Sequence, residues 1–127
     1  MIHSQRPGLI SLRRIESWNR GIELVVDVYA LTKHFPRDEM FGLTSQLRRA
    51  AVSIPSNIAE GNQRRTVADR RRFITDAQGS LAEVDTQLEI SSLLGYISDD
   101  LFCATIDRTD HIGRMLTKMY QHMTSRP

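Results

Sequence analysis

The sequence has little of what several classes of protein require. Its 127 residues contain one cysteine, Cys103, which excludes an internal disulfide framework and a cysteine-rich zinc site. The longest apolar stretch, residues 24–31, is interrupted by Asp27 and is far too short to cross a bilayer. Residues 1–14 lack the long apolar core of an export signal, so we expect a cytoplasmic protein that does not insert into a membrane.

Motifs for catalysis or metal binding are also lacking. The four histidines are scattered, and no two stand four residues apart, the spacing that places two ligands on one helix face. The Glu-x-x-His motif of di-iron helical bundles is missing, and so is a glycine-rich phosphate loop. We therefore expect a protein that is not an enzyme and that binds no metal, cofactor or small-molecule substrate.

Signals for β-strands are nearly absent, whereas apolar residues recur at helical spacing in four segments. These segments predict helices that begin near residues 15, 43, 66 and 98 and end near residues 35, 61, 95 and 124. Short connections between long helices imply antiparallel neighbours. The sequence therefore predicts an all-α, up-down-up-down four-helix bundle in residues 15–124, preceded by a loosely ordered arm, residues 1–14.

Several residues predict where these helices begin, end or bend. Thr66 and Ser98 are suited to cap the third and fourth helices. Gly61 and Gly95 are suited to the left-handed position that follows a helix. Pro55 lies inside the second helix, where it removes a backbone hydrogen bond, so we expect a kink there.

The first helix carries two apolar stripes, which together cover roughly 220° of its circumference at about 100° per residue. A helix on the surface of a monomer needs an apolar arc of only a little more than about 100°. We therefore expect a homo-oligomer, with one stripe in the core and the other at a subunit interface. The alternative is that one stripe is an exposed apolar surface, which is common. The predicted interface stripe consists of Leu24, Val28, Leu31 and Phe35.

Charge is distributed unevenly along the chain. Residues 48–72 contain seven arginines and two acidic residues, whereas residues 73–110 contain eight acidic residues and one arginine. Arginine suits two-pronged contacts to phosphate, so we predict a nucleic-acid-binding cluster at one end of the bundle. Seven phosphate contacts would give a slope of log K against log salt of roughly −6. The alternative is pairing with acidic residues, within the chain or across a subunit boundary. The arginines are Arg48, Arg49, Arg64, Arg65, Arg70, Arg71 and Arg72.

A polar stripe accompanies the apolar seam of the second helix near Pro55. Because a proline leaves a carbonyl group without its helical partner, we predict that this stripe forms a structural polar network that fixes helix packing or subunit register. Ligand binding is the alternative role. The stripe consists of Gln46, Ser53, Asn57 and Glu60.

Two long motifs resemble a known bacterial family. Residues 46–61 read Q-x-R-R-A-A-x-S-I-P-x-N-I-A-E-G, and residues 72–83 read R-F-I-x-x-A-x-G-S-L-x-E. Both are similar to the signature of the "four helix bundle protein" family, also called intervening-sequence proteins of large-subunit ribosomal RNA genes. The resemblance implies an antiparallel four-helix bundle that assembles, in related members, into a ring of five subunits. A more distant relative is the accessory protein of diversity-generating retroelements, a pentamer that binds nucleic acid and a reverse transcriptase.

Two hypotheses about function follow. The first is a non-enzymatic oligomeric scaffold, a pentamer by resemblance, that binds RNA or single-stranded DNA through its arginines without strong sequence preference. The second is a protein-interaction scaffold or accessory subunit for a partner such as a reverse transcriptase, without direct nucleic-acid binding. Its expected surfaces are the predicted interface stripe and a row of methionines at helical spacing: Met115, Met119 and Met123.

Overall fold

The computed structural model describes residues 6–123, and the regular structure in that range is helical throughout, without a β-strand. This confirms the all-α prediction. The elements are α1 (Ile10–Arg13), α2 (Glu16–Thr32), the 3-10 turn η2 (Arg37–Glu39), α3 (Leu43–Asn62), α4 (Val67–Leu93) and α5 (Asp99–His122).

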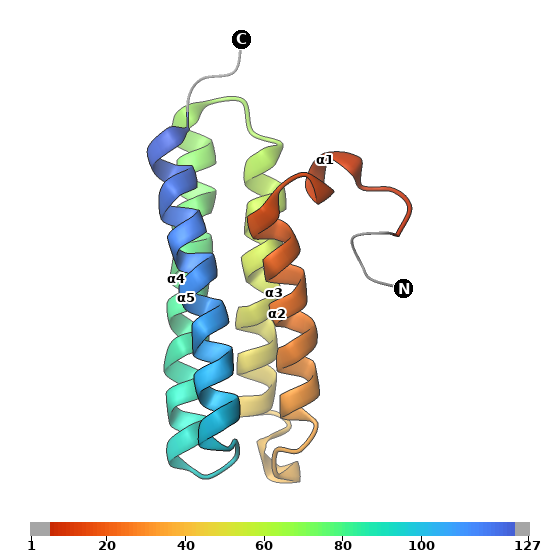
Figure 1. Ribbon diagram of the computed structural model, residues 1–127, viewed down its shortest axis with the longest axis vertical. Helices are drawn as coiled ribbons and strands as arrows, with labels where there is room; N and C mark the ends of the chain where they lie inside the picture. Colours follow the sequence, from red (N-terminus) through yellow and green to blue (C-terminus); the bar gives the residue numbers. More distant parts are fainter. Residues whose placement is uncertain (1–5, 124–127) are drawn as a thin grey trace.

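The four long helices lie side by side, and the chain reverses direction at each connection between them (Figure 1). Helix α2 packs against α3 and α5, and α4 packs against the same two helices. The molecule therefore has two ends. The α3–α4 end contains the connection of residues 63–66, the start of α2 and the finish of α5. The η2 end contains the connections of residues 33–42 and 94–98.

The helix termini follow the local signals in the sequence except at Gly61 and at the end of α2, which lies at Thr32 and not near residue 35. The Thr66 hydroxyl accepts a hydrogen bond from the backbone N–H of Asp69 at 3.1 Å, and the Ser98 hydroxyl accepts one from Leu101 at 3.1 Å. Each hydroxyl accepts a hydrogen bond from a backbone N–H group that has no partner within the first turn of the helix. Gly95 follows α4 with φ of 79°, as predicted for a residue in the left-handed region.

Gly61 does not end α3 as predicted. The helix continues through it to Asn62, and Gly61 lies outside the left-handed region that Gly8 and Gly95 occupy. A Cβ atom on Gly61 would lie 3.0 Å from the Cβ atom of Phe73. The glycine therefore allows the last turn of α3 to approach the first turns of α4 closely.

Pro55 lies within α3, which the structure describes as one continuous helix from Leu43 to Asn62. Its side chain is buried against α2, where a Cβ atom on Gly21 would lie 3.3 Å from the Cβ atom of Pro55. A second glycine thus brings two backbones close together. The kink at Pro55 stays a prediction.

The segment before the bundle contains a feature that the sequence did not indicate. Residues 10–13 of the predicted arm form the single turn of α1, and Leu12 and Ile15 pack against the core. Residues 1–5 of the arm lie outside the described residues.

The core corrects the prediction of a subunit interface along the first helix. All four side chains of the predicted stripe are buried among the chain's own apolar residues, with Val28 fully enclosed. Helix α2 contacts both α3 and α5, so two neighbours within one chain account for its wide apolar arc. In the other stripe, Trp18 is buried whereas Val26 is 63% exposed. The buried stripe comprises Leu24, Val28, Leu31 and Phe35.

Candidate nucleic-acid interface

The structure divides the seven predicted arginines between the two ends of the molecule. Arg48 and Arg49 lie in the first half of α3, near the η2 end, whereas the other five lie at or beyond the far end of that helix. At about 1.5 Å of rise per residue, Arg48 is about 21 Å from Asn62 along the helix axis. The prediction of one cluster of seven is therefore wrong, because it ignored the length of α3.

Arg70 is structural. Its side chain is buried, with only 5% of the residue exposed, and its Nη1 donates a hydrogen bond to the carbonyl oxygen of Arg65 at 3.1 Å. This contact ties the α3–α4 connection to the first turn of α4. A guanidinium in that position stabilises the turn and is not available to a phosphate group.

The remaining arginines at this end lie at the surface, and two aromatic rings hold three of them. The guanidinium carbon atoms of Arg64 and Arg72 lie 4.8 and 4.6 Å from the ring centre of Phe73. Arg71 lies 5.0 Å from the ring centre of Tyr120, and its Nε donates to the Tyr120 carbonyl oxygen at 3.3 Å. Guanidinium groups held in this way keep several N–H donors directed outward. We call Arg64, Arg65, Arg71 and Arg72 the surface arginines.

Helix α5 adds positive charge that the sequence pattern had not assigned to this site. Its last turns lie at the α3–α4 end, as the contact between Arg71 and Tyr120 shows. They present the exposed ammonium group of Lys118, and the ring of His122 lies beside it without adding to the charge at neutral pH. Among the residues that the structure describes, only Asp69 forms an ion pair with a surface arginine, a long one of 4.0 Å to Arg72. The excess of positive charge in residues 111–127 was the sequence signal for this contribution.

The predicted polar stripe forms a smaller network than expected. The hydroxyl of Ser53 on α3 is hydrogen-bonded to that of Ser80 on α4, and the amide of Asn57 donates to the Ser53 carbonyl oxygen at 2.8 Å. Gln46 and Glu60 are exposed. In the described part of the chain, Ser53 is therefore the one member of this stripe that is hydrogen-bonded to α4.

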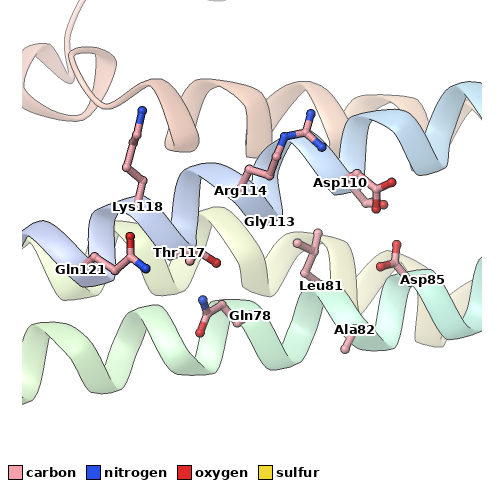
Figure 2. Close-up of a pocket in the computed structure, with 11 residues that line it drawn as sticks. Gln78, Leu81, Ala82, Asp85, Asp110, Gly113, Arg114, Thr117, Lys118 and Gln121 are labelled. Carbon is pink, nitrogen blue, oxygen red and sulfur yellow. The ribbon is translucent and has the colours of Figure 1, made fainter.

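A groove of about 630 Å³ runs between α4 and α5. Figure 2 shows Gln78, Leu81 and Asp85 of α4 facing α5, whereas Arg114 and Lys118 of α5 point away from α4. Burial raises the pKa of the Asp85 carboxyl, and the charge of nearby Asp110 adds to the rise.

The hydroxyl of Thr109 opposes this rise, but the effect of burial is larger. Within residues 6–123, no group of three or more histidine, cysteine or acidic side chains is arranged to hold a metal ion. The groove offers no set of catalytic groups comparable with a known mechanism, so it is a weaker candidate site than the surface arginines.

Asp85→Asn is expected to stabilise the protein near neutral pH. A carboxyl whose pKa is raised on folding weakens the native state when it is ionised, and this cost disappears as the pH falls through its native pKa. We expect a rise in Tm of about 2 °C at pH 7 that vanishes at a pH below the ordinary pKa of aspartate. Asp76→Asn, an exposed site on the same helix, is the control. An equal gain at acidic pH would show that the charge of Asp85 is not the cause.

None of the described helices is both long enough and apolar enough to span a membrane. The model of the 23S rRNA-intervening sequence protein family matches residues 13–118. No curated protein matches the sequence.

Among solved structures, the chain resembles a protein of unknown function from the S23 ribosomal protein family of Bacteroides thetaiotaomicron VPI-5482. The TM-score is 0.78 at 21% identity, and the match covers 84% of this chain and 96% of that one. At this identity the similarity shows the fold alone. The family match spans four of the helices nearly completely, and the chain belongs to the 23S rRNA-intervening sequence protein family.

Proposed function

We propose that this chain is a non-enzymatic antiparallel four-helix bundle that binds RNA or single-stranded DNA, without strong sequence preference, at its α3–α4 end. The observation that carries the proposal is the set of four surface arginines, three of them stacked on aromatic rings. Only one of the four, Arg72, forms an ion pair within residues 6–123.

The chemistry of this surface favours phosphate over bases. Guanidinium groups donate paired hydrogen bonds to phosphate oxygens, and such contacts position a nucleic acid without reading its sequence. The aromatic rings of this end are already occupied, since Phe73 is buried beneath two guanidiniums and Tyr120 contacts Arg71. Bases therefore have few rings on which to stack, which fits binding without sequence preference.

Arg65→Glu is expected to weaken RNA binding, whereas Arg49→Glu is expected to leave it unchanged. Both residues are exposed, but they lie at opposite ends of the molecule. Four phosphate contacts on a single strand predict a slope of log K against log salt of about −3 for the wild type. Removal of one contact should reduce that slope by about 0.7 and the affinity about fivefold at roughly 0.1 M salt. Fluorescence anisotropy of a labelled single-stranded RNA, over a series of salt concentrations, measures both quantities.

The two variants carry the same change of charge, so a loss that depends only on net charge affects them equally. Equal weakening would overturn the assignment of the site to the α3–α4 end. Binding that does not respond to salt would overturn the proposal as a whole.

A second candidate function, protein interaction, is supported by apolar side chains at the η2 end. Phe41 is 93% exposed and Leu93 is 79% exposed, and Met40 and Leu94 are also more than half exposed. Exposed apolar groups of this size commonly mark contacts with other proteins. Assembly into a homo-oligomer, a pentamer by resemblance, belongs to this proposal. Light-scattering mass, measured with and without the RNA, separates the two candidates: an oligomer indifferent to RNA would favour protein interaction.

A further inference from the structure

We propose that a pocket at the η2 end binds a phosphate group carried by a small organic molecule or by the end of an RNA chain. This site lies at the opposite end from the surface arginines, and the inference does not depend on the proposed function. The pocket has a volume of about 390 Å³. Its lining residues are Thr32, Lys33, Phe35, Pro36, Arg37, Met40, Thr44 and Arg48.

The charge of the lining is positive. Lys33, Arg37 and Arg48 all face this one pocket, and no acidic residue lines it. None of the three forms an ion pair within residues 6–123. Three cations brought together without a counter-ion repel one another, and an anion bound among them relieves that repulsion. The pocket is therefore suited to a ligand with more than one negative charge.

Arg48 is held in place for such a ligand. Its Nε donates a hydrogen bond to the hydroxyl of Thr32 at 2.8 Å, and its guanidinium carbon lies 4.5 Å from the ring centre of Tyr29. Both contacts fix the plane of the guanidinium and leave its two terminal nitrogens without a hydrogen-bond partner among the described residues. A phosphate group needs paired donors of this kind.

Thr44 provides a further donor at the same site. Only 8% of the residue is exposed, yet its hydroxyl has no hydrogen-bond partner in the described part of the chain. Because Thr44 lines the pocket, this hydroxyl is available to a ligand there. Thr44 also lies in the first turn of α3, four residues before Arg48 and on the same face of the helix.

Two acidic residues lie in the neighbouring turn, but neither lines the pocket. Glu39 accepts a hydrogen bond from the backbone N–H of Leu43 at 3.2 Å through Oε1 and one from the Tyr96 hydroxyl at 2.9 Å through Oε2. Asp38 is exposed. The Glu39 carboxylate is thus engaged by α3 and by the connection between α4 and α5, and the cations of the pocket remain in excess.

The remaining lining residues indicate the rest of the ligand. Phe35, Pro36 and Met40 form an apolar wall beside the cations. Sites for small ligands commonly combine apolar walls with a few polar groups that fix orientation. A terminal phosphate ester that carries an organic group, such as a nucleoside monophosphate, satisfies both parts of the pocket. The 5′-phosphate of an RNA chain has the same chemistry.

The proposal is tested by NMR titration of the ¹⁵N-labelled protein. Inorganic phosphate, at millimolar concentration, is expected to shift the backbone resonances of Lys33, Arg37 and Thr44, and a nucleoside monophosphate is expected to do so at lower concentration. The same nucleoside without phosphate should have no effect. Two short RNA chains that differ only in a 5′-phosphate or a 5′-hydroxyl then distinguish the two sources, since a preference for the phosphorylated chain identifies an RNA end.

Arg37→Gln removes one cation from the exposed turn, and Arg49→Gln, outside the pocket, is the matched control. We expect Arg37→Gln to weaken phosphate binding about tenfold, the size expected for one charge-assisted hydrogen bond, and Arg49→Gln to leave it unchanged. Arg48→Met should abolish binding, and Arg37→Gln keeps the test decisive if that variant is unstable. The proposal is overturned if phosphate leaves these resonances unshifted, shifts those of the α3–α4 end instead, or binds both glutamine variants equally.

Discussion

Val28→Asp is expected to unfold the protein, whereas Val26→Asp is expected to leave it folded. The two residues lie on one helix, but Val28 has no exposed surface and Val26 is 63% exposed. An unpaired charge in the core costs about 3–5 kcal/mol, a large part of the total of about 5–15 kcal/mol that stabilises a typical domain. Circular dichroism during thermal unfolding measures the effect.

This pair of variants also decides between the two interpretations of the first helix. If the stripe that contains Val28 formed a subunit interface, Val28→Asp would lower the mass in solution and keep the helical signal. Loss of the helical signal supports its place in the core of one chain. A folded Val28→Asp variant of reduced mass would contradict the structure described above.

Phe73→Ala is expected to lower the free energy of unfolding by about 3–5 kcal/mol, the usual loss when a buried phenyl ring is removed. The ring is buried between the last turn of α3, at Gly61, and the guanidiniums of Arg64 and Arg72. Its removal leaves a cavity and frees both guanidiniums from their contact. Urea unfolding of both proteins measures the change, which should shift the midpoint without a change in slope.

Tyr120→Ala provides the comparison for this variant. Tyr120 also contacts an arginine at the α3–α4 end, but 39% of it is exposed. We expect a loss of about 1 kcal/mol or less, because an exposed contact between a cation and a ring contributes little. Similar losses for both variants would mean that Phe73 is not the buried centre of this end.

Structural features that depend only on residues nearby in the sequence could be predicted from the sequence. Thr66 and Ser98 cap their helices as expected, and Gly95 adopts the predicted left-handed conformation. In each case the physical cause lies within three or four residues along the chain. The helix boundaries and the all-α class follow from the same short-range patterns.

Features that depend on packing between helices could not be predicted in the same way. The width of the apolar arc on α2 is the same whether its second neighbour is α5 or another subunit. Gly61 has the sequence context of a residue that ends a helix, but close contact with Phe73 explains it in the structure. The arginines were grouped by their distance along the sequence, and α3 separates Arg48 from Arg64.

The candidate sites show the same division. The surface arginines were identified in part, since four of the seven are placed as expected, but Lys118 lies at that end only because α5 returns to it. The phosphate pocket combines residues 32–37 with residues 44 and 48. Arg48 was predicted as part of the single arginine cluster, whereas Lys33 and Arg37 carry no signal in the sequence, and only the turn around η2 brings the three together.

The two glycine contacts of α3 have a mechanical consequence. Pro55 of α3 packs against Gly21 of α2, and Gly61 of α3 packs against Phe73 of α4. Helix α3 is therefore in close contact with both neighbours at two different levels along its axis. Displacement by one helical turn, about 5.4 Å, would move Pro55 away from Gly21 and Gly61 away from Phe73, so that each ring would meet a position that carries a side chain. Axial sliding, a common means of transmitting a signal through a bundle, is therefore closed to this helix. A ligand bound at one end of the molecule must therefore influence the other end through rearrangement of side chains or through a change in subunit assembly.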